Sequence, residues 1–114
     1  MKMRVLGIVR EKESGEPVAG LIVHAYDKDI VKSDLLGKTQ TGSDGKFLIE
    51  YDSVDFQELL DRNPDIYIEI YRSSDIKDQK TTRVRPIYTT KKSIRHNASS
   101  SEKYYVEISR KELK

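Results

Sequence analysis

Apolar and polar positions alternate with a period of two along most of the chain, a pattern typical of strands with one buried face. The alternation predicts strands over residues 4–11, 21–26, 38–41, 46–51, 65–72, 81–88 and 104–109. Turn-forming runs such as Ser14-Gly15-Glu16-Pro17 and Ser43-Asp44-Gly45 separate them. Seven short strands spaced in this way predict an all-β fold, a seven- to eight-stranded antiparallel Greek-key β-sandwich.

The same period assigns side chains to the two faces of each strand. In residues 21–26 one face carries Leu21, Val23 and Ala25, and the other carries Ile22, His24 and Tyr26. In residues 65–72 the three isoleucines face inward, and the outward row is Tyr67, Glu69 and Tyr71. If these strands share a sheet, the outward rows form one patch of aromatic and aliphatic side chains.

One stretch departs from the period of two. Within residues 52–65, Phe56, Leu59 and Leu60 have helical spacing, and Pro64 ends the pattern. This stretch predicts one short helix inside the β fold. A weaker strand over residues 81–88 contains Pro86, which favours an edge position because proline has no N–H to donate.

Length and composition set the outer limits. The chain has 114 residues, which fits a single domain over 1–114, and it has no cysteine, which excludes a disulfide framework or a thiolate metal site. No stretch has the length of a transmembrane helix or the apolar core of a signal peptide. We therefore expect no membrane insertion and, by default, a cytoplasmic location, although the composition does not choose a compartment.

The net charge of the chain is +2, but the charge is unevenly distributed along it. Residues 1–57 carry a net charge of −2 and residues 58–114 a net charge of +4, and residues 80–101 hold six cations and no acid. This segment can attract an acidic partner, or it is a solvated loop. Its cations are too sparse to indicate nucleic-acid binding, so we expect no nucleic-acid partner.

The order of motifs in the first half resembles that of a known superfamily. It runs Gly7-Ile8-Val9, then Gly15-Glu16-Pro17-Val18-Ala19-Gly20-Leu21-Ile22-Val23, then Thr41-Gly42-Ser43-Asp44-Gly45-Lys46-Phe47. This order resembles the transthyretin-like, or carboxypeptidase regulatory-like, β-sandwich domains. The resemblance implies a mostly non-catalytic module that braces enzymes or binds partners.

Two enzyme groups with related folds require residues that this sequence does not place in their motifs. The transthyretin-related hydroxyisourate hydrolases need a C-terminal Tyr-Arg-Gly-Ser, whereas this chain ends in SRKELK. Intradiol dioxygenases hold iron with two tyrosines and two histidines in a characteristic order, which His24 and His96 do not match. We therefore expect no enzymatic activity and no catalytic residues.

An aspartate-rich stretch offers an alternative function. Asp27, Asp29 and Asp34, followed by Leu35-Leu36-Gly37, resemble part of a calcium-binding C2 loop, to which Asp44 can add a ligand. Calcium takes six to eight oxygen ligands in flexible geometry, which suits carboxylates two residues apart on a loop. The plainer interpretation is a solvated connection whose acids are neutralised by nearby lysines. No other cofactor is expected.

The leading hypothesis is a binding or accessory module that acts through protein–protein contacts, with another protein or a second copy of the chain as partner. The candidate interface is the outward patch of Tyr67, Tyr71, Tyr26 and His24, because tyrosine-rich patches are favoured at interfaces. The alternative is that another part of the chain, such as the 52–65 helix or the basic 80–101 segment, covers this patch.

Overall fold

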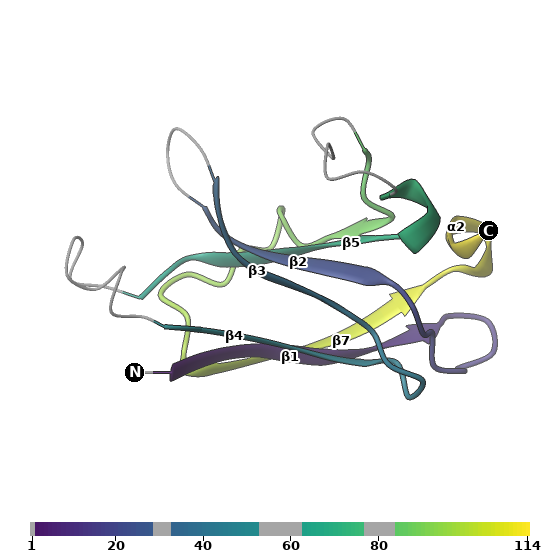
Figure 1. Ribbon diagram of the computed structural model, residues 1–114, viewed down its shortest axis with the longest axis horizontal. Coiled ribbons are helices and arrows are strands. Elements are labelled where there is room, and N and C mark those ends of the chain that lie inside the picture. Colours follow the sequence, from purple (N-terminus) through teal and green to yellow (C-terminus); the bar gives the residue numbers. More distant parts are fainter. Residues whose placement is uncertain (1, 29–32, 53–62, 77–83) are drawn as a thin grey trace.

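The computed structural model describes residues 2–28, 33–52, 63–76 and 84–114. Its strands form two packed sheets, which confirms the all-β sandwich (Figure 1). One sheet has three strands in the order β4 (Lys46–Asp52), β1 (Lys2–Glu11), β7 (Ser101–Ile108). The other has four strands in the order β3 (Ser33–Gln40), β2 (Ile22–Lys28), β5 (Ile66–Tyr71), β6 (Tyr88–Thr89).

Strand direction differs from the expectation at one pair. All paired strands run antiparallel except β1 and β7, which pair in parallel from Arg4 opposite Ser101 to Glu11 opposite Ile108. The chain thus starts and ends in the same sheet. A period of two gives the face of a side chain but not the direction of its neighbour, so the alternation could not distinguish this pair.

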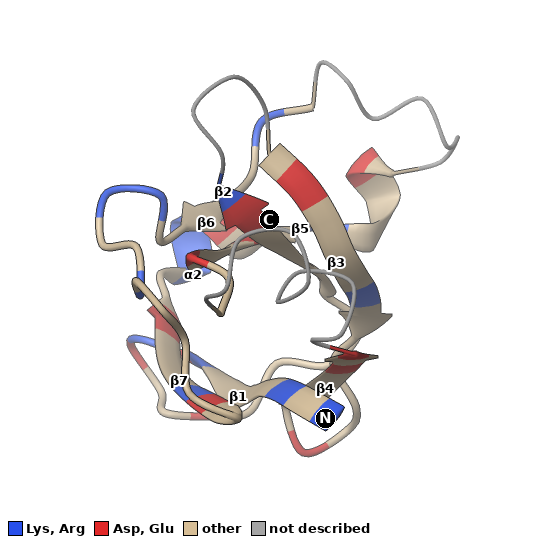
Figure 2. Cartoon of the chain, turned by 90° about the vertical axis from the view of Figure 1, so that its left-hand side faces the viewer, with Lys and Arg blue, Asp and Glu red and all other residues tan. Residues whose placement is uncertain are grey.

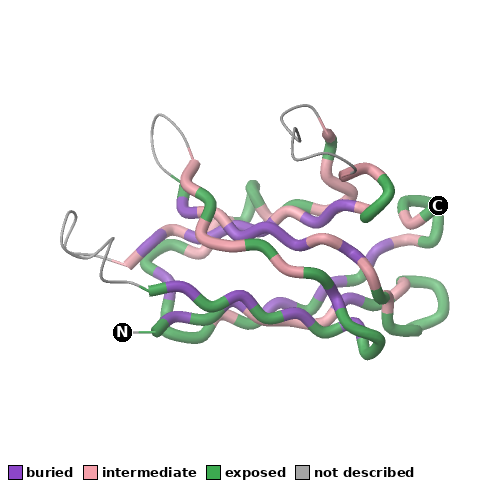
Figure 3. The backbone as a smooth tube through the Cα atoms, in the orientation of Figure 1, coloured by how far each residue is buried: buried purple, intermediate pink, exposed green. Residues whose placement is uncertain are grey.

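The core lies between the sheets and follows the predicted alternation. Buried and exposed residues alternate along β4, and they do so in β1 on both sides of Leu6, Gly7 and Ile8, which are all half-buried (Figure 3). Ile66, Ile68 and Ile70 are each 0% exposed and belong to the same core cluster as inward residues of β1 and β4. Gly7 faces the core as well, and a Cβ there would lie 2.9 Å from the Phe47 ring. Glycine at this position therefore makes room for the Phe47 ring.

Two predicted strands differ from the structure. The third strand was expected over residues 38–41, but β3 begins at Ser33, because a bulge opposite Ala25 and Tyr26 lets the ladder continue past Gly37. The expected strand over 81–88 is wrong in its described part. Residues 84–87 lie outside any strand, and only Tyr88–Thr89 pair as β6.

The helices also differ from the expectation. The described chain contains one short α-helix, α2 (Arg110–Leu113), and a 3₁₀ turn, η1 (Ser73–Asp75). The helix expected within 52–65 falls largely on residues 53–62, which lie outside the described residues. Of the helices described, none is long and apolar enough to cross a membrane.

Candidate functional site

The predicted tyrosine–histidine patch forms on the outer face of the four-stranded sheet. Strands β2 and β5 pair directly, with Tyr26 opposite Tyr67 and His24 opposite Glu69. The Tyr26 and Tyr67 rings stack with centroids 5.1 Å apart, and the His24 and Tyr71 rings lie 5.0 Å apart. The expectation that the two outward rows share one patch is therefore confirmed.

Hydrogen bonds tie the polar atoms of this patch together. The Tyr71 hydroxyl donates to Oε1 of Glu69 at 3.1 Å, and the Tyr26 hydroxyl lies 3.1 Å from Nδ1 of His24. Burial lowers the pKa of His24, and Lys38 lowers it further by charge repulsion. Burial together with the nearby Glu69 carboxylate raises the pKa of Tyr71. Both shifts favour the uncharged forms of the imidazole and the phenol.

The chain itself already covers most of this patch. Tyr67 is only 3% exposed and His24 only 7% exposed, while Tyr26 is half-buried. Lys91 comes from the basic segment 80–101, and its Nζ lies 5.8 Å from the centre of the Tyr67 ring. This contact is of the kind expected if the basic segment covers the patch. Little of the patch is left for a partner to contact.

The structure brings two aspartates of the proposed calcium loop, Asp27 and Asp34, to opposite positions on paired strands, whereas Asp44 lies in a separate turn. Asp27 is buried, and its Oδ1 accepts a hydrogen bond from the Asp65 N–H at 3.0 Å. Asp34 lies opposite it on β3, and Asp44 accepts from the Lys46 N–H in its own turn. Asp29 lies outside the described residues. Within the described parts of the chain, no three His, Cys, Asp or Glu side chains form a group that could hold a metal ion. Calcium binding stays a prediction.

His96 lies apart from the outer patch. Its Nδ1 is 3.6 Å from a carboxylate oxygen of Asp65, at the end of the sandwich where Ile66 bridges to Arg95. His24, in contrast, sits in the middle of β2 on the outer face. The two histidines of the chain therefore belong to two separate environments.

A second site, which the sequence analysis missed, lies on the outer face of the three-stranded sheet. The cross-strand pairs place Leu48 beside Leu6 and Tyr105 beside Ile8, so four apolar side chains form a diagonal across β4, β1 and β7. Leu48 is 47% exposed and Tyr105 is 80% exposed. We call these four residues the open stripe.

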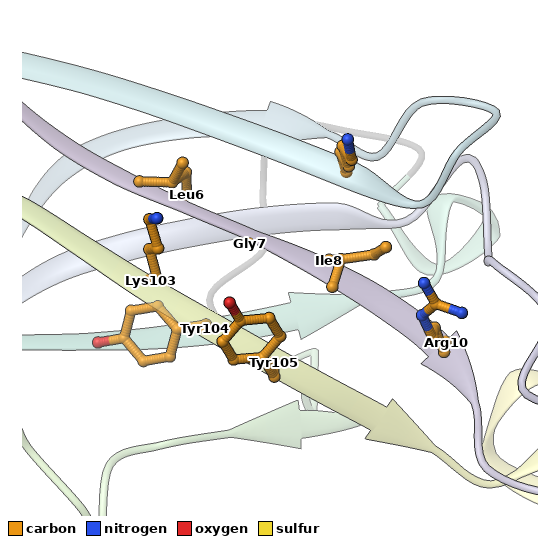
Figure 4. Close-up of a pocket in the computed structure, with 8 residues that line it drawn as sticks. Leu6, Gly7, Ile8, Arg10, Lys103, Tyr104 and Tyr105 are labelled. Carbon is orange, nitrogen blue, oxygen red and sulfur yellow. The ribbon is translucent and has the colours of Figure 1, made fainter.

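A shallow groove of about 410 Å³ runs along this face between β1 and β7 (Figure 4). Leu6, Ile8 and Tyr105 supply its apolar lining, and the side chains of Arg10, Lys46 and Lys103 supply its cations. Glu107 lies opposite Arg10 in the strand register, so the surplus positive charge is at the two lysines. Basic residues on the strands of this sheet are visible in Figure 2.

The signal for the open stripe is present in the sequence. Residues 4–11 carry apolar side chains on both faces, with Val5 and Val9 inward and Leu6 and Ile8 outward. A strand in a sheet with one solvated face normally has polar residues outward. The outward pair of aliphatic residues in β1 was thus a sequence signal for an apolar outer face on this sheet.

Comparisons with known proteins support the fold. No protein-family model and no curated protein matches the chain. Among solved structures, a segment of a 9R-lipoxygenase from Cyanothece PCC8801 matches 94% of this chain with a TM-score of 0.60 and 18% identity. The chain spans only 16% of the length of that lipoxygenase.

A second solved structure is similar over most of both chains. It is the dioxygenase domain of a dioxygenase–carbohydrate-binding protein fusion from Streptomyces sp. SirexAA-E. It matches 95% of this chain and 79% of its own length, with a TM-score of 0.52 and 14% identity. At this level of identity the similarity shows a shared sandwich fold and does not extend to activity.

Proposed function

We propose that this chain is a non-catalytic binding module that holds a protein partner on the outer face of its three-stranded sheet. One observation carries the proposal: the open stripe lies across the middle of a regular sheet and remains exposed to solvent. A contiguous apolar patch bordered by charge is typical of an interaction site. The rival patch on the other sheet is already buried by the chain itself.

Charge indicates the kind of partner. Lys46 and Lys103 border the groove, and within the described parts of the chain neither forms an ion pair. Two copies meeting through this same face would bring two positively charged grooves together, which opposes self-association. A partner with apolar side chains and surrounding carboxylates is complementary to the face.

A non-catalytic role is consistent with the state of the His24 cluster. The imidazole of His24 bonds to the Tyr26 hydroxyl and the Tyr71 hydroxyl donates to Glu69, and because His24 and Tyr71 are buried, a substrate has little access to them. The cluster therefore acts in packing, and the exposed groups available for contact are those of the opposite sheet.

Two matched leucines test the proposal. Leu48 and Leu35 are exposed to similar extents, 47% and 51%, but lie on different sheets. The immobilised chain is used to capture proteins from an extract of its native cells, and captured proteins are quantified by mass spectrometry. We expect Leu48→Ser and Tyr105→Ser to reduce capture of the main partner by at least about tenfold. Leu35→Ser should leave capture unchanged, and the opposite pattern would reject the site.

A further inference from the structure

The two halves of the free edge of β7 differ in whether their backbone groups form hydrogen bonds. Ile108 accepts a hydrogen bond from the Lys12 N–H, and the Arg4 N–H donates to Ser100. Even-numbered residues of β7 therefore turn their backbone groups toward β1. The N–H and C=O of one strand residue point to the same side, so Ser101, Lys103, Tyr105 and Glu107 turn theirs toward the free edge.

The chain itself caps the first half of this edge. The Ser101 carbonyl accepts from Oγ of Ser99 at 3.0 Å, and the Lys103 carbonyl accepts from Nη1 of Arg95 at 2.6 Å. In the second half, no described residue forms a hydrogen bond with the edge-facing backbone of Tyr105 or Glu107. An unpaired strand edge is a template for another strand.

The open half of the edge lies directly beside the groove. Tyr105, the most exposed large hydrophobic residue among those that the structure describes, is on β7 itself, and Lys103 precedes it by one outward position. Neighbouring strands lie about 4.8 Å apart, so a strand added here would place alternate side chains against the Tyr105 ring. Its next outward side chain would come close to the Lys103 ammonium.

From this juxtaposition we propose that the partner binds by adding an extended acidic segment to the open half of β7. The inference rests on the proposed function and specifies its binding mode. On its outward face the segment carries an apolar residue packed on Tyr105 and, two residues away, a carboxylate near Lys103. Backbone hydrogen bonds to Tyr105 and Glu107 give affinity, and the side chains facing the groove give specificity.

A synthetic peptide tests this mode directly. The probe is a fluorescein-labelled peptide with the repeat Val-Thr-Glu-Thr, in which Val and Glu alternate along one face of an extended strand, and its binding is followed by fluorescence anisotropy. One control peptide is N-methylated at alternate positions, which removes the N–H donors of one edge, and another has Lys in place of Glu. The protein variants are Lys103→Glu and, as a matched control on the exposed helix α2, Lys111→Glu.

We expect the Val-Thr-Glu-Thr peptide to bind and both control peptides to fail. Lys103→Glu should weaken binding by at least about tenfold, because attraction becomes repulsion, whereas Lys111→Glu should not change it. Equal binding of the N-methylated peptide would overturn strand addition. Sedimentation that shows a dimer resistant to the peptide would assign the edge to a second copy instead, which also overturns the inference.

The capture experiment with Leu48→Ser distinguishes a wrong binding mode from a wrong binding face. If capture depends on Leu48 and Tyr105 but the peptide does not bind, the face is right and the strand-addition mode is wrong. If capture is independent of both residues, the proposed function itself fails.

Discussion

The outer faces of the two sheets carry similar residues but are in opposite states. Both present tyrosines and aliphatic side chains beside lysines. On the four-stranded sheet, Tyr67 is 3% exposed and stacks on Tyr26 beneath Lys91, whereas on the three-stranded sheet Tyr105 is 80% exposed. The first face contributes to stability by burying its rings, and the second leaves apolar area in water. Sequence-local patterns define a face, but the packing of distant segments decides whether it is available for binding.

The sharpest test of this difference compares one residue type on the two faces. Tyr67→Ala removes a buried ring and should lower the free energy of unfolding by about 3 kcal/mol. Tyr105→Ala removes an exposed ring and should change it by less than about 0.5 kcal/mol. Urea denaturation followed by circular dichroism measures both. Equal losses of unfolding free energy would show that the two tyrosines are buried to the same extent.

A smaller effect isolates the hydroxyl of the covered face. Tyr71→Phe deletes the donor to Glu69 while keeping the ring, and should cost about 1 kcal/mol in unfolding free energy. Tyr105→Phe is the matched control, and its stability should equal that of the wild type. The same denaturation series measures these variants. A Tyr71→Phe variant with the unfolding free energy of the wild type would argue against the Tyr71–Glu69 hydrogen bond.

The pH dependence of stability follows from the lowered pKa of His24. The unfolded chain takes up a proton on this imidazole near its ordinary pKa of about 6.5, and the folded chain does so only at lower pH. Stability from this group is therefore full above pH ~6.5 and falls as the pH drops through and below that value. His24→Gln should show a smaller loss of melting temperature between pH 7 and pH 5 than the wild type.

The smallest expected effect concerns calcium. Since Asp27 is buried and accepts the Asp65 N–H, we expect no rise in melting temperature when millimolar calcium replaces excess EDTA. Thermal unfolding of the wild type and of Asp27→Asn/Asp29→Asn checks this. A calcium-dependent rise that the double variant loses would establish the aspartate loop as a metal site.

Much of the fold could be predicted because alternation is a local property. The inward faces of residues 21–26, 46–51 and 65–72 follow directly from it, and the structure confirms them. The parallel pairing of β1 with β7 and the bulge in β3 depend on partners far away in the chain, so no local pattern shows them. The alternation in residues 81–88 was misleading beside Pro86, which cannot donate to a ladder.

The candidate site was harder to predict for a related reason. The tyrosines of β5 were correctly placed on an outer face, but their burial depends on contacts such as that of Lys91, 24 residues away from Tyr67 in the chain. Leu6, Leu48 and Tyr105 come from three separate strands, and only the register of the sheet unites them. The local signs of this face were outward apolar residues in three strands, namely the pair in β1, Leu48 in β4 and Tyr105 in β7.

The central claim is that a partner binds to the open stripe and leaves the tyrosine–histidine patch untouched. Hydroxyl-radical footprinting with mass spectrometry measures this most directly, because oxidation of each tyrosine reports its contact with solvent. In the free chain we predict strong labelling of Tyr105 and weak labelling of Tyr67 and Tyr71. Addition of the captured partner should protect Tyr105 and leave the other two unchanged. Persistent labelling of Tyr105 in the complex, with protection of Tyr26 instead, would contradict the account.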